Sequence, residues 1–178
     1  MQALVLAVRP ARVTSYAIVQ GTAVYDADSW HLLAEVKTTG PRATPADRLV
    51  PLMERRLGDV IEGFALTYPL DAIVIGLADD PACGAEADAL CGAVERAALR
   101  ASTWYRMVAA ELWREELADR HDLTDVVAAA RAVSGSWKRS RAKIDSREAA
   151  EAVMMGVHAS GHLGIPCLDA MPDGECPD

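Results

Sequence analysis

The chain has 178 residues, of which 51% are hydrophobic and 25% charged, and its formal net charge is −8. This length fits one domain with a substantial core. The acidic total argues against a protein that coats nucleic acid regardless of its structure, although it is compatible with a local basic patch. No stretch approaches the roughly 18 apolar residues of a membrane span, so we expect no membrane partner.

Cysteine usage points to a reducing compartment. Four cysteines are present, at Cys83, Cys91, Cys167 and Cys176. They lack the Cys-x-x-Cys spacing of common zinc sites. Arg9 and Arg12 interrupt the apolar run at the start of the chain, so this run does not fit a signal peptide. We therefore expect reduced thiols and a cytoplasmic location.

The chain opens with two apolar runs, which predict strands over residues 3–9 and 13–20. A continuous apolar run that ends at a breaker is typical of a strand buried on both faces. The bend at Pro10 is short, so the two strands should pair antiparallel.

A third strand and a long helix should follow. The acidic stretch 26–29 predicts a polar turn and residues 30–37 predict a strand, so that three consecutive strands form a meander. Thr44 as N-cap and Pro45 at the first helical position predict a helix start. Apolar residues then recur at helical spacing to about Phe64.

The second half of the chain predicts alternating strands and helices. Residues 71–77 are a short apolar run after a helix, which favours a central parallel strand with that helix as its crossover. The next expected elements are a helix that begins within residues 81–84 and ends near residue 101, and a strand over 104–108. Three further helices are expected over 109–117, 124–133 and 145–160, with Thr124 as the cap of the second. We expect an irregular C-terminal tail at 164–178.

The opening motif resembles that of the RuvC group of Holliday-junction resolvases, within the RNase H-like superfamily. That group carries Leu-Gly-Ile-Asp-Pro-Gly followed by a Thr-Gly-Tyr-Gly-Val strand. Here the same frame reads Leu6-Ala7-Val8-Arg9-Pro10-Ala11, then Thr14-Ser15-Tyr16-Ala17-Ile18. The resemblance implies an α/β fold over residues 1–163: an RNase H-like mixed sheet, made of an antiparallel three-stranded meander plus parallel strands, flanked by helices.

Nucleases of this fold hold two divalent ions between carboxylates. The resemblance places these acids at the ends of the first and central strands and in a pair on the last helix. The corresponding residues here are Arg9, Gly76, and the pair Glu148 and Glu151. Both strand acids are missing, and a guanidinium repels the cation that should bind. We therefore expect a pseudonuclease without a metal or other cofactor, in which Arg9 pairs with Glu148 or Glu151.

Two alternatives to a pseudonuclease remain open. The first is an active Mg²⁺-dependent junction endonuclease that rebuilds its site from Glu148, Glu151 and a neighbouring acid such as Asp145 or Asp79. A cluster of three or more carboxylates would favour it. The second is a structural partner protein with no nucleic acid role.

A basic segment precedes the last helix, where the resemblance implies contact with the DNA backbone. Its candidate nucleic-acid-binding residues are Trp137, Lys138, Arg139, Arg141 and Lys143. The aromatic ring can stack on a base or sugar and the cations can contact phosphates. A solvated loop that offsets an acidic domain is the competing interpretation. The expected role is that of a subunit that binds structured DNA or another protein, as a homodimer like the resolvases, in DNA recombination.

His158 and His162 lie four residues apart on one face of the last helix. Two histidines at this spacing can bind Zn²⁺, but no Glu follows the first, so the metalloprotease motif is absent. Packing or a position at the helix end is the preferred interpretation.

Overall fold

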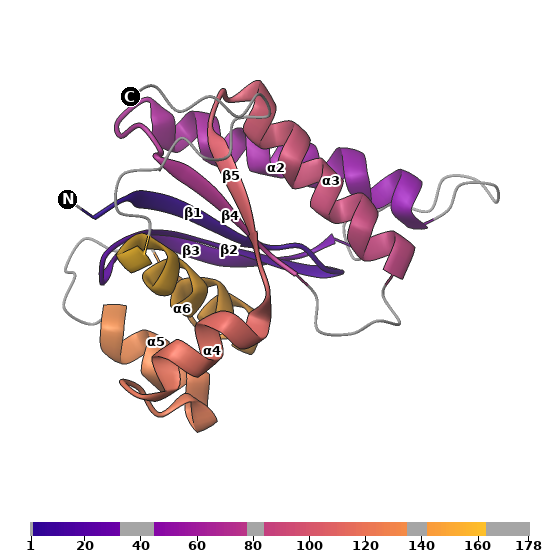
Figure 1. Cartoon of the computed structure of the whole chain (residues 1–178). Helices are drawn as coiled ribbons and strands as arrows, with labels where there is room; N and C mark the ends of the chain where they lie inside the picture. Colours follow the sequence, from indigo (N-terminus) through magenta and orange to yellow (C-terminus); the bar gives the residue numbers. More distant parts are fainter. Residues whose placement is uncertain (1, 33–44, 78–83, 135–141, 163–178) are drawn as a thin grey trace, which may run out of the picture.

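The computed structural model describes residues 2–32, 45–77, 84–134 and 142–162. Five strands form one mixed sheet in the order β3-β2-β1-β4-β5 (Figure 1). The strands are β1 (Leu4–Arg9), β2 (Val13–Gln20), β3 (Ala23–His31), β4 (Ala72–Gly76) and β5 (Trp104–Val108). Strands β1, β2 and β3 pair antiparallel, whereas β4 is parallel to both β1 and β5. The predicted meander with parallel strands beside it is confirmed.

Helices cover both faces of the sheet. On one face lie α2 (Pro45–Ala65) and α3 (Gly84–Arg100), which pack on each other. On the other face lies α6 (Arg147–His162), and α4 (Ala110–Ala118) and α5 (Val126–Ser134) lie outside α6 (Figure 1). A short 3₁₀ turn, η2 (Leu123–Asp125), precedes α5. No helix in the described ranges is long and apolar enough to cross a membrane.

The alternation of side chains along β1 divides the core in two. Leu6 and Val8 belong to the apolar cluster under α2 and α3. Val5 and Ala7 belong to the cluster under α6. Because side chains alternate along a strand, Arg9 continues the second set and points toward α6.

Helix α6 lies close against the sheet because its inner face is made of small residues. Every residue from Ala149 to Val157 is buried. A Cβ added at Gly156 would lie 2.8 Å from Val19 Cγ2 on β2. The start of the helix is capped by the Ser146 hydroxyl, which accepts a hydrogen bond from the Ala149 backbone N–H at 3.1 Å.

The predicted third strand was placed too late in the sequence. Strand β3 begins at Ala23, so the acidic stretch 26–29 lies inside the strand rather than in a turn. The turn lies at Gly21, whose φ of 62° is the left-handed conformation that glycine adopts without strain. Residues 33–37, which were expected to extend the strand, lie outside the described ranges.

Partners on neighbouring elements explain why acids are tolerated in β3. The Tyr16 hydroxyl donates a hydrogen bond to Asp26 at 3.0 Å, and Lys143 Nζ lies 3.0 Å from Asp28. Strand β3 is at the edge of the sheet, where charged side chains reach water and protect against pairing with other chains.

The other element boundaries fall close to their predicted places, with one wrong cap. The expected cap Thr124 lies inside η2, and Asp122 is the N-cap, whose carboxylate accepts from the Thr124 N–H at 3.0 Å. Of the four cysteines, Cys91 is described and is buried in α3. The expected cap Thr44 and the expected tail 164–178 lie outside the described residues.

Candidate functional site

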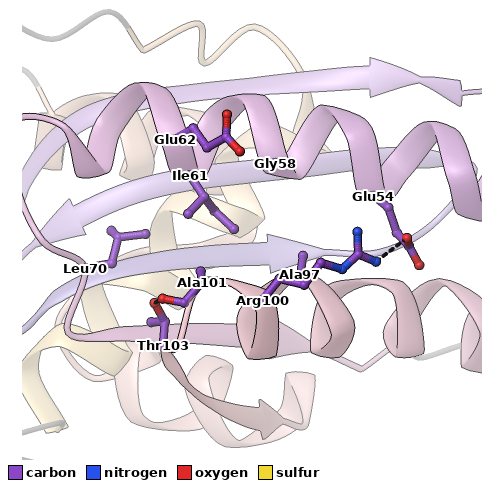
Figure 2. A pocket seen from close by; sticks show the side chains of 9 residues that line it. All are labelled: Glu54, Gly58, Ile61, Glu62, Leu70, Ala97, Arg100, Ala101 and Thr103. Atoms are coloured by element: carbon purple, nitrogen blue, oxygen red, sulfur yellow. Dashed lines mark hydrogen bonds and ion pairs between the residues drawn. The ribbon is translucent and has the colours of Figure 1, made fainter.

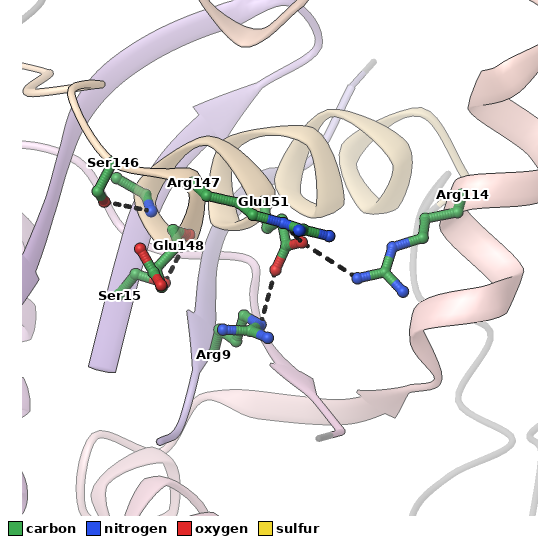
Figure 3. A network of polar contacts seen from close by, with 8 residues as sticks. Arg9, Ser15, Arg114, Ser146, Arg147, Glu148 and Glu151 are labelled. Atoms are coloured by element: carbon green, nitrogen blue, oxygen red, sulfur yellow. Dashed lines mark hydrogen bonds and ion pairs between the residues drawn. The ribbon is translucent and has the colours of Figure 1, made fainter. Parts of the chain in front are cut away.

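The positions that the sequence singled out meet at the carboxyl edge of β1 and β4. The register pairs Val8 with Ile75, so Arg9 and Gly76, one residue further on, are neighbours on adjacent parallel strands. The first two turns of α6 lie over this edge and carry Glu148 and Glu151 (Figure 3). In open α/β sheets this edge is where ligands commonly bind.

Arg9 forms an ion pair with Glu151. Its Nε lies 3.0 Å from Glu151 Oε2, and the Glu151 side chain is only 4% exposed. The expectation that Arg9 pairs with an acid of the last helix is confirmed, with Glu151 as the partner. Because the carboxylate is buried, its attraction to the guanidinium is weakly screened by salt and water.

Two further arginines contact the other oxygen of the same carboxylate. Arg147 Nε lies 3.0 Å and Arg114 Nη2 lies 3.1 Å from Glu151 Oε1 (Figure 3). Three positive charges thus surround one buried negative charge, and we call these four residues the arginine cluster. The Arg147 contact follows the i, i+4 rule and was readable from the sequence. Arg114 comes from α4, and nothing in the sequence pointed to it.

A methionine covers the position where the second strand acid should stand. A Cβ added at Gly76 would lie 2.8 Å from Met155 Sδ and 3.2 Å from Met155 Cε. Met155 is buried on α6, one turn after Glu151. A longer side chain at residue 76 therefore requires the thioether to move.

Among the described residues, no group of three acids gathers at this edge. Glu148 is partly buried, and its backbone carbonyl accepts a hydrogen bond from the Ser15 hydroxyl at 2.7 Å. Asp71 lies at the opposite end of β4, where its carboxylate accepts from the Leu4 N–H at 2.7 Å. Asp145 is exposed, and Asp79 lies outside the described residues.

The donor set at the strand edge does not fit a pair of Mg²⁺ ions. Magnesium prefers oxygen ligands, usually carboxylates and water, and the described part of the edge offers one buried carboxylate that already faces three guanidiniums. Among the described residues, one group of three potential metal ligands converges elsewhere: Glu116, His158 and His162.

The predicted DNA-binding segment is described only at its end. Trp137, Lys138, Arg139 and Arg141 lie outside the described residues. Lys143 lies beside β3, where its backbone N–H donates to the Ala27 carbonyl at 2.7 Å. Its Nζ hydrogen bond to Asp28 raises the pKa of Lys143.

A hollow of about 300 Å³ lies on the opposite face of the sheet, between α2 and α3 (Figure 2). Ile61, Leu70 and Ala97 line it, and Arg100 reaches across it to Glu54. The hydrogen bond from Arg100 lowers the pKa of Glu54. The Glu54 carboxylate is therefore already paired, whereas Glu62, which also lines the hollow, is exposed.

The arrangement of strands and helices is that of the RNase H-like fold in its RuvC-like form. Three solved structures share it: Thermus thermophilus RuvC in complex with a Holliday junction substrate, Thermus thermophilus RuvC alone, and the yeast mitochondrial Holliday junction resolvase Ydc2. Their TM-scores are 0.64, 0.59 and 0.50, at 16%, 19% and 12% sequence identity.

These likenesses extend over nearly the whole chain. The three alignments cover 91%, 87% and 90% of this chain and 96%, 92% and 83% of the respective neighbour. No protein-family model and no curated protein matches the sequence. At these identities the comparison establishes the RuvC-like fold and leaves the activity to be argued from the site.

Proposed function

We propose that this chain is a RuvC-like pseudonuclease that binds structured DNA without cleaving it. The observation that carries the proposal is the ion pair between Arg9 and the buried Glu151, at 3.0 Å. In nucleases of this fold the corresponding positions carry carboxylates that hold metal ions. Here a guanidinium occupies the first of them and neutralises the surviving acid.

The arginine cluster opposes two-metal cleavage. That mechanism needs two divalent ions, which activate water and stabilise the leaving oxygen. A fixed positive charge about 4 Å from a cation costs about 1–4 kcal/mol per unit charge, between the dielectric of water and that of a protein surface. Three guanidiniums stand around the one buried acid.

The same charges suit a phosphate. A guanidinium has five N–H donors in a planar fork that matches phosphate oxygens. Arg147 is 73% exposed and Arg114 33% exposed, so a phosphate in solvent can approach both guanidiniums. A hollow of about 380 Å³ borders both side chains and would give the phosphate backbone of DNA access to them. The positive charge that metal ions supply in a nuclease would then come from arginine.

The basic segment before α6 provides a second proposed contact with DNA. Replacing Lys138, Arg139 and Arg141 together should abolish binding if these side chains reach phosphates. If the triple variant bound DNA with unchanged affinity, the basic segment would not contribute to binding, and the arginine cluster would be the proposed contact that remains. Because the chain carries a net charge of −8, we expect weak and salt-sensitive binding.

The decisive test is fluorescence anisotropy with a labelled four-way junction and a duplex of equal length, in EDTA and in Mg²⁺. We expect preferential junction binding that does not depend on Mg²⁺, and no cleavage in Mg²⁺ or Mn²⁺. Arg147→Gln should weaken binding and reduce the salt slope by about one.

A matched control is Arg96→Gln, which removes one exposed arginine that pairs with Glu54 on the opposite face of the sheet. It should leave the affinity and the salt slope unchanged. Junction cleavage would contradict the pseudonuclease and favour a rebuilt metal site. The absence of junction binding at low salt would contradict the DNA role and favour a protein-interaction subunit.

Two expectations from the sequence remain part of this proposal. By analogy with the resolvases we propose a homodimer, which sedimentation velocity can test by the mass of the particle. We also propose a cytoplasmic location, because the spacing of the cysteines favours reduced thiols. Fractionation of cells that produce the tagged chain can test this location.

A further inference from the structure

Three potential metal ligands converge near the end of α6 remote from the arginine cluster. His158 and His162 are one turn apart, and their ring centroids are 4.5 Å apart. Glu116 reaches them from α4: its Oε2 lies 3.0 Å from His158 Nε2 and 2.7 Å from His162 Nε2. One donor atom from each of the three residues lies within 4.8 Å of the other two.

We propose that Glu116, His158 and His162 bind one Zn²⁺ or a similar divalent transition metal ion. Two imidazole nitrogens and one carboxylate are a common ligand set of zinc sites that keep a position open for water. A hollow of about 210 Å³ borders all three side chains and provides room for that water. The proposal is independent of the pseudonuclease assignment, because none of these residues belongs to the arginine cluster.

The geometry needs only a small adjustment to accept an ion. Zinc ligands lie about 2.0–2.1 Å from the metal, so tetrahedral donor atoms are roughly 3.3 Å from one another. Glu116 Oε2, now 3.0 and 2.7 Å from the two Nε2 atoms, must therefore move away from each by about 0.3–0.6 Å to admit the ion between them. Glu116 is 51% and His162 56% exposed, so both side chains are free to make this movement. His158, at 10% exposed, is the fixed member of the set.

Partial burial favours the neutral form of the His158 imidazole. It lowers the pKa of the imidazole, and the charges of His162 and Arg106 act in the same direction, while Glu116 opposes them. The net effect keeps the ring neutral near pH 7, and the neutral ring is the form that binds a metal. Both Nε2 atoms contact the same carboxylate oxygen, Glu116 Oε2, so they already face one point.

Two features limit the affinity. The guanidinium of Arg106 lines the same hollow and repels a divalent ion. His158 Nδ1 is buried without a hydrogen-bond partner, so it lacks the acceptor that usually orients a metal-bound histidine. Since such an acceptor is worth about 10–100-fold in affinity, we expect micromolar rather than nanomolar binding.

A bound ion would connect α4 to α6 at one end, as Arg114 and Glu151 connect the same two helices at the other. Trp113 and Leu117 flank Arg114 and Glu116 along α4, and both are buried in the same core cluster as the inner face of α6. The ion would therefore stabilise the position from which Arg114 contacts Glu151.

The test is titration of the full chain with Zn²⁺ and Co²⁺ at pH 7.5, by calorimetry and by visible absorption. We expect one ion per chain, a Co²⁺ ligand-field spectrum without a thiolate charge-transfer band, and a rise in Tm with Zn²⁺. His162→Ala and Glu116→Gln should each weaken binding at least about tenfold. Both change exposed side chains, so the variants should fold.

Two matched variants separate this site from non-specific binding. His31→Ala removes an exposed histidine at the end of β3 and should leave binding unchanged. Arg106→Gln should tighten binding by roughly threefold to tenfold, because it removes a repulsive charge beside the ion. Failure of the wild type to bind Zn²⁺, or binding that survives His162→Ala and Glu116→Gln, would overturn the proposal. A thiolate band would assign the ion to cysteines instead.

Discussion

At the scale of single residues, Glu151 sets the electrostatics of the strand edge. Its two oxygens lie 3.0–3.1 Å from nitrogens of Arg9, Arg114 and Arg147. A buried ion pair contributes little net stability compared with apolar residues of the same shape, but removing one partner leaves the others uncompensated. Loss of the Glu151 carboxylate would therefore leave positive charge uncompensated and destabilise the fold.

We predict that Glu151→Gln destabilises the fold by about 2–4 kcal/mol, because three guanidiniums then lose the buried carboxylate that they share. Arg147→Gln should cost less than about 1 kcal/mol, since Arg147 is 73% exposed and its i, i+4 pair is largely screened. Urea unfolding of both variants measures the difference. If both variants lost the same free energy of unfolding, the three arginines would not share the Glu151 carboxylate.

A second prediction concerns repair of the metal site. The wild type should not bind Mg²⁺ or Mn²⁺, and Arg9→Asp alone should bind weakly because Met155 still covers Gly76. Arg9→Asp combined with Gly76→Glu and Met155→Ala should bind Mg²⁺ in calorimetry, since it supplies the missing carboxylates and the space for them.

The control for this repair is Met155→Ala alone, which opens a cavity and should cost about 2–5 kcal/mol without creating metal affinity. Circular dichroism must show that the combined variant is folded. Magnesium binding by the wild type would mean that the acids are assembled elsewhere and that the assignment of Arg9 and Gly76 is wrong.

At the scale of elements, the close approach of α6 to the sheet is what brings Glu151 within reach of Arg9. The approach depends on Gly156, where an added Cβ would lie 2.8 Å from Val19 Cγ2 and 3.3 Å from Ala7 Cβ. Both neighbours are short side chains of the sheet that cannot swing away. The helix can lie at this distance only if the position has no side chain.

We predict that Gly156→Ala destabilises the protein by about 1–3 kcal/mol, because overpacking outweighs the better helix propensity of alanine. Gly58→Ala on α2 is the matched control. Nothing lies within 4 Å of a Cβ at Gly58, so alanine there should stabilise by up to about 1 kcal/mol. Thermal or urea unfolding of the two variants shows whether each substitution stabilises or destabilises the protein. A stabilised Gly156→Ala variant would contradict the close packing of α6.

At the scale of the whole molecule, the partly buried His158 connects stability to pH. Burial is the main cause of its lowered pKa, and the hydrogen bond to Glu116 partly offsets it. In the unfolded chain the ring has a pKa of about 6.5. As the pH falls below that value the unfolded state takes up a proton that the folded state does not, so stability is lost.

We predict a fall in the free energy of unfolding between pH 7.5 and pH 5.5, measured by urea unfolding in EDTA. His158→Gln should reduce this dependence, because glutamine does not titrate. Glu116, His162 and Arg106 face the ring and remain in the variant, so the comparison isolates His158. An identical pH dependence in both proteins would assign the effect to other groups.

Most of the element order was predictable because it depends on local patterns. Apolar runs, helical periodicity and the Pro45 start predicted β1, β2, α2 and β4 close to their observed bounds. The failure at β3 has a physical cause. Its acids at 26 and 28 resemble a turn in sequence. In the strand, Asp26 accepts from Tyr16 of β2 and Asp28 pairs with Lys143 of the segment before α6, and no local pattern reveals these partners.

The candidate site was predictable in part. The opening motif and the Glu148–Glu151 pair located the strand edge and predicted that its two strand acids are replaced by Arg9 and Gly76. The sequence could not show that Glu151 rather than Glu148 meets Arg9, because the choice depends on how α6 is rotated over the sheet. Nor could it place Met155 over Gly76 or Arg114 beside Glu151.

The sequence by itself thus predicted the fold class and the order of helices and strands along the chain, and it suggested the interpretation that Arg9 and Gly76 stand in place of metal ligands. The tertiary structure alone decided which charges meet: three arginines from β1, α4 and α6 on one carboxylate, and Glu116 from α4 on two histidines of α6. The reason is that hydrophobic periodicity is a local property of the chain. Ion pairs between elements depend on packing distances and helix rotation, which no local pattern specifies.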